Sequence, residues 1–270
     1  MIIGISGKKQ SVKNTVANII QYLIAQKNGF CPNGLNSYTV GQLETGSNWE
    51  QKQFAGKLKE IICILTGCSL EDLEKEEFKN SFLPKEWNID NRRITYRWLL
   101  QSLGTDVIRE IHGNAWINAL MREYKEVDGY DIHNEYIRLG GKGISTLKDK
   151  VINDRVQEKL KDYIKRNTSN WIITDVRFPN ELNAIKEKKG IVIRVNRYHI
   201  DKCTIGLIHN KNCVADVTCY ECNHYNQSNH PSETSLDNAR FDYVIDNNDN
   251  IESLTEKVKQ ILIKENLITE

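Results

Sequence analysis

Residues 2–20 read IIGISGKKQSVKNTVANII, and this stretch decides the fold. Its first five residues are mostly apolar and predict a short buried strand. From Lys13 onward, apolar residues recur at helical spacing, with Gly7 in the turn between the two elements. Strand, turn and helix in this order are the opening unit of a parallel α/β sheet. Ligands of such folds gather at the carboxyl ends of the strands, so we expect a ligand at the loop that follows Gly7.

The loop nearly matches a phosphate-binding pattern, G-x-x-x-x-G-K-S/T between a strand and a helix. Gly7 opens the pattern, Val12 replaces the second glycine, and Lys13 is the lysine. Asn14 stands in the place of the hydroxyl residue, with Thr15 one position further on. In such a loop, backbone N–H groups at the helix N-terminus face the phosphates, and the lysine supplies a point charge. The pattern predicts a phosphate site.

Val12 is the physical objection to this prediction. Glycine serves where the backbone needs a positive φ or a close approach to a ligand, and a β-branched residue with positive φ is an outlier. Either the loop tolerates Val12 in a slightly shifted geometry, or the valine weakens ATP binding. An ordinary strand–turn–helix with surface lysines is the third interpretation of the loop.

The rest of the chain alternates strands and helices. The strand after residue 170 ends on an acid, and further strands are predicted at 191–195 and 241–246. Gly67 is the predicted C-cap of a helix over 54–67, and Ser69 the predicted N-cap of the next. Other helices are predicted over 95–103, 115–124, 148–166, 180–190 (closed by Gly190) and 251–265, with loops over 126–148 and 199–232.

This alternation predicts an α/β fold with a parallel sheet flanked by helices on both faces. We expect one domain over 1–270 with three insertions. They are a helical acceptor-binding insertion at about 50–125, a lid at about 126–168 and a Cys/His-rich loop at about 199–230.

Composition excludes several classes of function. The chain has 270 residues, with 37 Lys plus Arg against 36 Asp plus Glu, and this neutral balance argues against binding to nucleic acid polymers or membranes. No apolar run approaches the ~18 residues that a membrane span needs, and no signal-peptide pattern opens the chain. We therefore expect a soluble, cytoplasmic protein whose 7 cysteines form no disulfides.

A second candidate site stretch is WIITDVRFPNE, residues 171–181. The predicted strand delivers Asp175 to the sheet edge, where a carboxylate can hold Mg²⁺ through water or accept from a substrate hydroxyl or base. Arg177 offers a planar, permanent charge that suits a phosphate. The alternative is a salt bridge that caps the next helix, with Glu181 near its first turn.

Residues 95–120 supply further candidates. Arg97, Gln101 and Gly104 lie at helical spacing and share a face, and Arg109 is one more cation to expect near a transferring group. Trp116 is either a core residue or a stacking partner for a base. The segment HPSE (230–233) is a loop with Ser232 starting a helix, and it shows no nucleophile–base pair.

Taken together and in this order, these stretches resemble the deoxynucleoside monophosphate kinases of bacteriophages. The matching segments are GISGKKQSVKNTVA (4–17), FAGKLKEI (54–61), YRWLLQSLGTDVIRE (96–110) with Trp116, IITDVRFPNEL (172–182), and SNHPSETSLDN (228–238) through VIDNNDNIESL (244–254). The resemblance implies a P-loop nucleoside monophosphate kinase fold and phosphoryl transfer from ATP, with Mg²⁺, to a deoxynucleoside monophosphate. It also suggests a homodimer and, for a viral protein, the host-cell cytoplasm.

The resemblance also implies site residues. Thr15 would be the hydroxyl nearest the magnesium, and HPSE would approach the base or ribose side of ATP. The residues implied for ATP are Gly7, Lys8, Lys9, Gln10, Ser11, Lys13, Asn14 and Thr15. Those implied for the acceptor nucleotide are Lys59, Arg97, Gly104, Thr105, Trp116, Asp175, Arg177 and Glu181. The catalytic set would be Lys13, Arg97, Asp175 and Arg177.

The chain departs from the family at the loop, where the family usually reads Gly-Lys-Asp-Thr and this chain reads Val12-Lys13-Asn14-Thr15. Two alternatives therefore stay open. One is a catalytically impaired nucleotide-binding protein of the same fold, and the other is a P-loop kinase of another small phosphorylated metabolite.

A Cys/His-rich stretch lies between His199 and His230. Cys219 and Cys222 form a CxxC, which is a common half of a zinc site. Cys203, Cys213 and nearby histidines could complete a structural Zn²⁺ site, or the stretch is a polar loop with free thiols.

Overall fold

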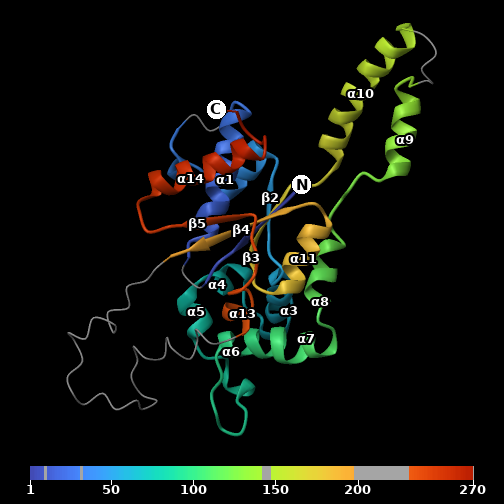
Figure 1. The fold of residues 1–270 in the computed structure, drawn as a ribbon. Helices are drawn as coiled ribbons and strands as arrows, with labels where there is room; N and C mark the ends of the chain where they lie inside the picture. Colours follow the sequence, from blue (N-terminus) through green and yellow to red (C-terminus); the bar gives the residue numbers. More distant parts are fainter. Residues whose placement is uncertain (9–10, 31–32, 142–146, 198–230, 270) are drawn as a thin grey trace.

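The structure is a computed structural model that describes residues 1–8, 11–30, 33–141, 147–197 and 231–269. In this part of the chain, five parallel strands form one sheet in the order β2-β3-β1-β4-β5, flanked by helices (Figure 1). The strands are β1 (Ile2–Ser6), β2 (Glu50–Lys52), β3 (Trp171–Val176), β4 (Ile191–Asn196) and β5 (Tyr243–Asp246). The predicted fold class is confirmed.

β1 lies at the centre of the sheet, between β3 and β4. Ile2 pairs with Trp171 of β3, and Ser6 pairs with Arg194 of β4. Because all three strands run in the same direction, their carboxyl ends meet at one edge, next to the loop after β1. This is where ligands of parallel sheets bind.

Side chains alternate between the two faces of the sheet. Ile3 and Ile5 are buried with α1 (Lys13–Lys27) and α14 (Ile251–Lys264) on one face. Ile2 is buried on the other face, where α11 (Pro179–Glu187) lies. The β1 run is apolar throughout because both of its faces are covered.

The remaining helices include a helical layer against the α11 face of the sheet. They are α2 (Val40–Ser47), α3 (Gly56–Thr66), α4 (Leu70–Glu74), α5 (Glu76–Asn80), α6 (Tyr96–Gln101), α7 (Ile108–Ile111), α8 (Ala115–Met121), α9 (Gly129–Arg138), α10 (Leu147–Asn167) and α13 (Pro231–Thr234), with short 3-10 turns η1 (Leu35–Ser37) and η2 (Lys85–Trp87) and a π-helical turn η3 (Ser102–Val107). The predicted caps at Gly67 (φ 75°) and Ser69, which accepts from the Asp72 N–H, are confirmed.

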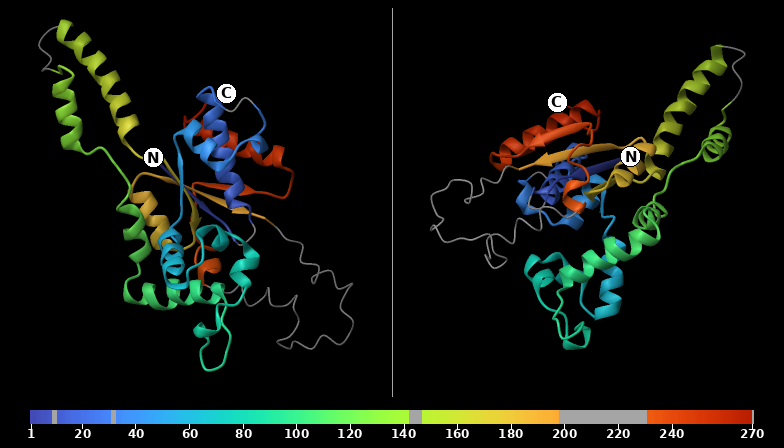
Figure 2. Two further views of the ribbon diagram at one scale, coloured as in Figure 1. Left: turned by 180° about the vertical axis from the view of Figure 1, so that it is seen from behind. Right: turned by 60° about the horizontal axis from the view of Figure 1, so that its bottom comes forward.

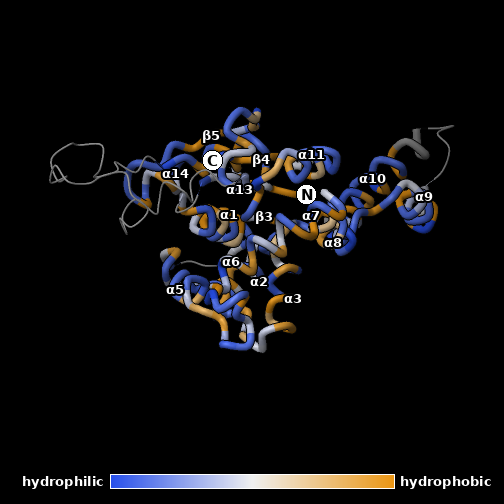
Figure 3. Tube along the Cα trace, turned by 90° about the horizontal axis from the view of Figure 1, so that it is seen from below, coloured by the Kyte–Doolittle hydropathy of each residue, from blue (hydrophilic) through white to orange (hydrophobic). Residues whose placement is uncertain are grey.

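The predicted loop over residues 126–148 is wrong where α9 forms. Asp128 caps this helix by accepting from the Asp131 N–H at 2.8 Å, and Tyr136 donates to Asn153 of α10. Glycines and charges in the segment concealed the helical period. α9 and α10 form an arm that projects from the sheet (Figures 1 and 2) and is largely hydrophilic (Figure 3).

The position of the arm can be compared with that expected of the predicted lid. It joins the body just before β3, where the Ser169 N–H donates to the Lys125 carbonyl at 2.9 Å. This junction lies at the amino ends of the parallel strands, whereas the loop after β1 lies at their carboxyl ends. In this structure the arm therefore does not cover the loop.

Three smaller differences concern two missing elements and the ends of two others. The sequence did not predict β2 or α2. The helix before β4 ends through Lys189, which has φ 56°, and not through a left-handed Gly190. Gly190 is instead required for close packing, because a Cβ there would lie 2.7 Å from the Ile2 carbonyl oxygen. α13 begins at Pro231, so the predicted loop to residue 232 is two residues too long at its end, and the helix begins one residue before Ser232.

Candidate functional site

The loop after β1 places Val12 in the left-handed conformation, with φ 60° and ψ 33°. The Val12 carbonyl accepts from the Val16 N–H at 3.1 Å and so starts α1, while the Ser11 N–H donates to the Lys8 carbonyl at 3.2 Å. This is the backbone region that favours glycine, so the position where the pattern asks for glycine does need a positive φ. A valine held there stores about 1–3 kcal/mol of strain.

Gly7 is needed for a different reason. A Cβ at this position would lie 2.6 Å from the Val195 carbonyl oxygen and would overlap the Ser11 hydroxyl. Gly7 and Ser11 are buried, so the loop packs tightly against β4. The tight packing fixes where the chain enters α1.

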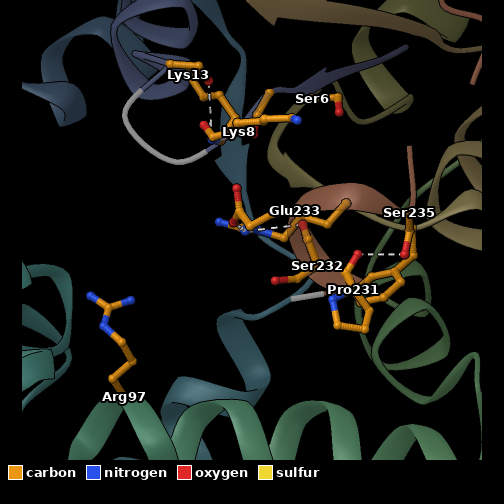
Figure 4. Close-up of polar contacts among 12 residues, drawn as sticks. Ser6, Lys8, Lys13, Arg97, Pro231, Ser232, Glu233 and Ser235 are labelled. Carbon is orange, nitrogen blue, oxygen red and sulfur yellow. Dashed lines mark hydrogen bonds and ion pairs between the residues drawn. The ribbon is translucent and has the colours of Figure 1, made fainter. Parts of the chain in front are cut away.

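Lys13 folds back over the loop (Figure 4). Its Nζ donates to the carbonyls of Gly7 and Lys8, both at 2.8 Å. Burial lowers the pKa of Lys13 to about 8, and the positive charges of Arg177 and Arg194 act in the same direction. The first turn of α1 contains no acidic residue. A half-buried ammonium close to two guanidinium groups favours the arrival of an anion.

β3 brings Asp175 and Arg177 to the same edge of the sheet. The carboxylate of Asp175 accepts from the N–H groups of Phe54 (2.8 Å) and Ala55 (2.9 Å), and so it anchors the start of α3. Arg177 forms an ion pair with Glu233 of α13. Asp175 and Arg177 are both close enough to Lys13 for their charges to shift its pKa. The sequence prediction therefore assembled three residues that do lie together.

Glu181 is buried behind this edge, with 1% of its surface exposed. It accepts from the N–H groups of Arg177 (2.8 Å) and Phe178 (3.1 Å) and pairs with the guanidinium of Arg109. Burial raises the pKa of Glu181 to about 7, and the charge of Asp175 adds to this effect while Arg109 opposes it. Glu181 thus holds the turn that carries Arg177, which is the helix-capping role that the sequence left open.

Two predicted acceptor residues lie on helices and are paired within the chain. Lys59 of α3 donates to Gln53 and Glu74, both at 2.6 Å. Arg97 of α6 donates to Asn80 at 2.7 Å and to Glu76 at 2.5 Å. Figure 4 shows Arg97 pointing from α6 toward the space below Glu233, across from Lys8 and Lys13.

Trp116 belongs to the core in this structure. Only 5% of it is exposed, and its indole N–H donates to the Gly104 carbonyl at 2.9 Å. Gly104 is itself buried, and a Cβ there would lie 2.6 Å from a methyl carbon of Leu58. Base stacking on Trp116 is not supported by this burial, whereas Thr105 is half-buried in the π-helical turn η3.

Sequence reasoning missed two polar residues of this edge and the partner of a third. Arg194 and Asp237, which were not predicted, interact with each other, and Asp237 also pairs with Lys8. Glu233, in the segment HPSE, pairs with Arg177. A signal for Arg194 was present, since a charged residue interrupts the apolar run IVIRV. Glu233 lies in HPSE, but its partner is 56 residues away in the sequence.

The residues present fit the phosphates of ATP better than they define a metal site. No cluster of three or more His, Cys, Asp or Glu suits a metal ion among the residues that the structure describes. Mg²⁺ commonly needs only one or two protein ligands beside substrate phosphates, and Thr15, half-buried in the first turn of α1, remains the candidate hydroxyl. Asn14 is exposed.

Several predictions fall outside the described residues. They include Lys9 and Gln10 of the loop and the whole candidate zinc site at Cys203, Cys213, Cys219 and Cys222. Within the described part, Cys63 and Cys68 are free thiols with sulfurs 3.8 Å apart. No described helix combines the length and apolarity that crossing a membrane requires.

Comparisons with known proteins add little. No family model matches the chain, and no curated protein matches it. Among solved structures, a dephospho-CoA kinase from Campylobacter jejuni is similar over 100% of this chain and 98% of its own, at 10% sequence identity and a TM-score of 0.33. A likeness this low supports no conclusion about activity. The class that the geometry itself defines is a parallel α/β protein with a cation-rich loop at the carboxyl end of its central strand.

Proposed function

We propose that this protein is a kinase that transfers a phosphoryl group from ATP, with Mg²⁺, to a deoxynucleoside monophosphate. The observation that carries the proposal is the position of Lys13, whose amine lies over the loop between β1 and α1 beside Arg177 and Arg194. Phosphoryl transfer depends mainly on positioning and on neutralising charge, and this edge supplies both.

The loop side is the proposed ATP site. Backbone N–H groups at the start of α1 face a phosphate favourably, and Lys13 exchanges its contacts with the loop carbonyls for phosphate oxygens. Thr15 supplies a hydroxyl toward the Mg²⁺ that ATP carries. Arg177 exchanges Glu233 for a phosphate oxygen.

The helical side is the proposed acceptor site. Arg97 reaches toward the loop from α6 (Figure 4), and Lys59 lies on α3, whose start is fixed by Asp175. In the unliganded chain both cations contact carboxylates, so the acceptor phosphate must replace Glu76 and Glu74. Trp116 and Gly104 position the η3 turn that holds Thr105.

A second candidate is an impaired nucleotide-binding protein. The left-handed conformation of Val12 favours it, because the strain must be retained when phosphate binds. A P-loop kinase of another small phosphorylated metabolite fits the same cations equally well, since they would recognise the phosphate and not the base.

A coupled assay of ADP release separates these candidates. The purified chain is supplied with ATP, Mg²⁺ and, in turn, each deoxynucleoside monophosphate, each ribonucleotide and a panel of phosphorylated metabolites. The proposal expects turnover with at least one deoxynucleoside monophosphate. ATP binding without turnover on any acceptor supports the impaired protein, and turnover confined to a non-nucleotide acceptor supports the other kinase.

A further inference from the structure

Arg194 stands at the carboxyl end of β4 and faces the loop. In the sheet it pairs with Ser6, the last residue of β1, and one of its terminal nitrogens lies 3.2 Å from the Ser6 hydroxyl. Its charge is among those that lower the pKa of Lys13. Arg194 therefore borders the proposed ATP site, although the loop pattern does not contain it.

The charge of Arg194 is buried and loosely paired. Its side chain is 10% exposed, and the facing carboxylate among the described residues is Asp237, at 3.3 Å. Asp237 also pairs with Lys8, at 3.1 Å. One carboxylate thus serves two cations, and the better hydrated of them is Lys8, whose side chain is 54% exposed. A buried guanidinium with a shared, long contact gains most from a new anionic partner.

We propose that Arg194 is a further phosphate-binding residue, which contacts a polyphosphate at the loop while Asp237 acts as the competing internal anion that the polyphosphate displaces. The inference rests on the proposed function and deepens it. The guanidinium offers two parallel N–H donors to one phosphate group, a geometry that the single amine of Lys13 does not provide.

The competing explanation is a structural one. Arg194 lies over the ring of Phe241, 5.5 Å from its centroid, and also contacts Asn196 at 3.3 Å. The contact with Phe241 would tie β4 to the segment before β5 without any ligand. In that case, removal of Asp237 would leave anion binding unchanged or would only weaken the fold.

The test measures binding of ATP and of inorganic tripolyphosphate by calorimetry, in the wild type and in Arg194→Gln, Arg194→Lys and Asp237→Asn. Lys257 and Asp249 form a surface pair at 3.1 Å near α14, so Lys257→Gln and Asp249→Asn are matched controls for the change in charge. Thermal unfolding reports whether each variant folds.

We expect Arg194→Gln to weaken tripolyphosphate binding about tenfold or more, which corresponds to the loss of a hydrogen bond to a charged group. Arg194→Lys should fall between Arg194→Gln and the wild type. Asp237→Asn should tighten binding severalfold, and both control variants should bind like the wild type. If Arg194→Gln does not fold, Asp237→Asn decides the question when it is measured in a Lys8→Gln background, because Asp237 also pairs with Lys8 and the tightening that remains there is that of the arginine.

Unchanged binding in both Arg194→Gln and Asp237→Asn, with binding still lost in Lys13→Ala, would overturn the role of Arg194 and leave the proposed function intact. Failure of the folded wild type to bind either ATP or tripolyphosphate would overturn both.

Discussion

The loop edge and the helical side of the proposed site hold their cations in different ways. At the loop edge, the amine of Lys13 contacts backbone carbonyls, and one carboxylate, Asp237, is shared by Lys8 and Arg194. The lowered pKa of Lys13 is the electrostatic consequence of burial among positive charges. This edge favours an anion before any ligand arrives.

On the helical side, each predicted cation has a carboxylate of its own. The pairs are Lys59 with Glu74, Arg97 with Glu76, and Arg109 with Glu181. These carboxylates neutralise the cations on this side, so a phosphate binds there only by replacing a carboxylate. The difference indicates that Lys13 can bind a phosphate without displacing a carboxylate, whereas Arg177, which pairs with Glu233, and the cations of the helical side bind one by exchange of partners.

The largest effect should come from Lys13→Ala. Loss of the only ammonium that folds over the described part of the loop should lower phosphoryl transfer about 100-fold to 1,000-fold, the scale seen when one charge-stabilising donor is removed. The ADP-release assay checks this, with Lys257→Gln as a surface control. Full activity of Lys13→Ala would show that Lys13 and its loop take no part in phosphoryl transfer.

The pH dependence of ATP binding should also distinguish the loop edge. With a pKa of about 8, the free Lys13 amine loses its proton as the pH rises through 8, while the phosphate-bound amine keeps it. Affinity for ATP should therefore fall about tenfold for each pH unit above 8. Lys13→Arg stays charged and should show no such fall. Equal pH profiles for the two proteins would contradict the lowered pKa.

On the helical side, the pH dependence of the unfolding free energy tests the raised pKa of Glu181. Its pKa rises from 4.5 to about 7 on folding, so the folded state holds the proton more tightly. The unfolding free energy should fall as the pH rises from 4.5 to 7, by up to about 3 kcal/mol at 1.36 kcal/mol per pKa unit. Urea unfolding at pH 5 and pH 8 should show this loss in the wild type relative to Glu181→Gln; the partly buried N-terminal amine of Met1, with a pKa lowered to about 6, stabilises both proteins alike as the pH rises.

Glu135→Gln is the control for that measurement. Arg138 holds the pKa of the Glu135 carboxyl below its usual value, so this group stays ionised from pH 5 to pH 8. Its substitution should leave the pH dependence of stability unchanged. A wild-type profile parallel to that of Glu181→Gln would show that the buried carboxyl is ionised throughout.

A smaller effect is expected from Arg97→Ala. If Arg97 contacts only the acceptor phosphate, its loss should raise the KM for the acceptor about tenfold and leave the KM for ATP unchanged. Steady-state kinetics with each substrate varied in turn would measure both. A rise in the KM for ATP alone would show that Arg97 belongs to the ATP site and not to the acceptor site.

The separation in the sequence between interacting residues explains how much of the molecule the sequence predicts. β1, the loop and α1 are contiguous, so spacing alone identifies the strand, the helix and Val12 as the position where the pattern asks for glycine, while the positive φ of Val12 comes from the structure. Asp175 and Arg177 follow as well, because parallel strands end at one edge. The alternation of strands and helices likewise fixes the fold class.

The missing parts depend on long-range pairing. Arg177 meets Glu233 across 56 residues, and Arg194 meets Asp237 across 43, which no local pattern records. Of the α9–α10 arm, the sequence predicted α10, as a helix over 148–166, and missed α9 for a different reason. Its first helix is short and polar, and its helical form depends on a cap at Asp128 and on contact with α10.

The smallest expected effect is that of Val12→Gly. The substitution removes the strain of a β-branched residue at φ 60°, but it also adds backbone freedom to the unfolded chain and removes the contact of Val12 with the core between α1 and α14. These terms oppose each other, so we expect the unfolding free energy to change by less than about 1 kcal/mol. ATP affinity should be preserved or improved.

Asn48→Gly is the matched control, because Asn48 also has a left-handed backbone, with φ 59°, at the C-cap of α2 and away from the loop. Calorimetry of ATP binding should find no change in this control. A clear loss of ATP affinity in Val12→Gly, with Asn48→Gly unchanged, would show that the valine side chain itself holds the loop in its binding conformation. Lys13 would then owe its position over the Gly7 carbonyl to the packing of Val12, and the departure from the glycine pattern would be an adaptation of this loop.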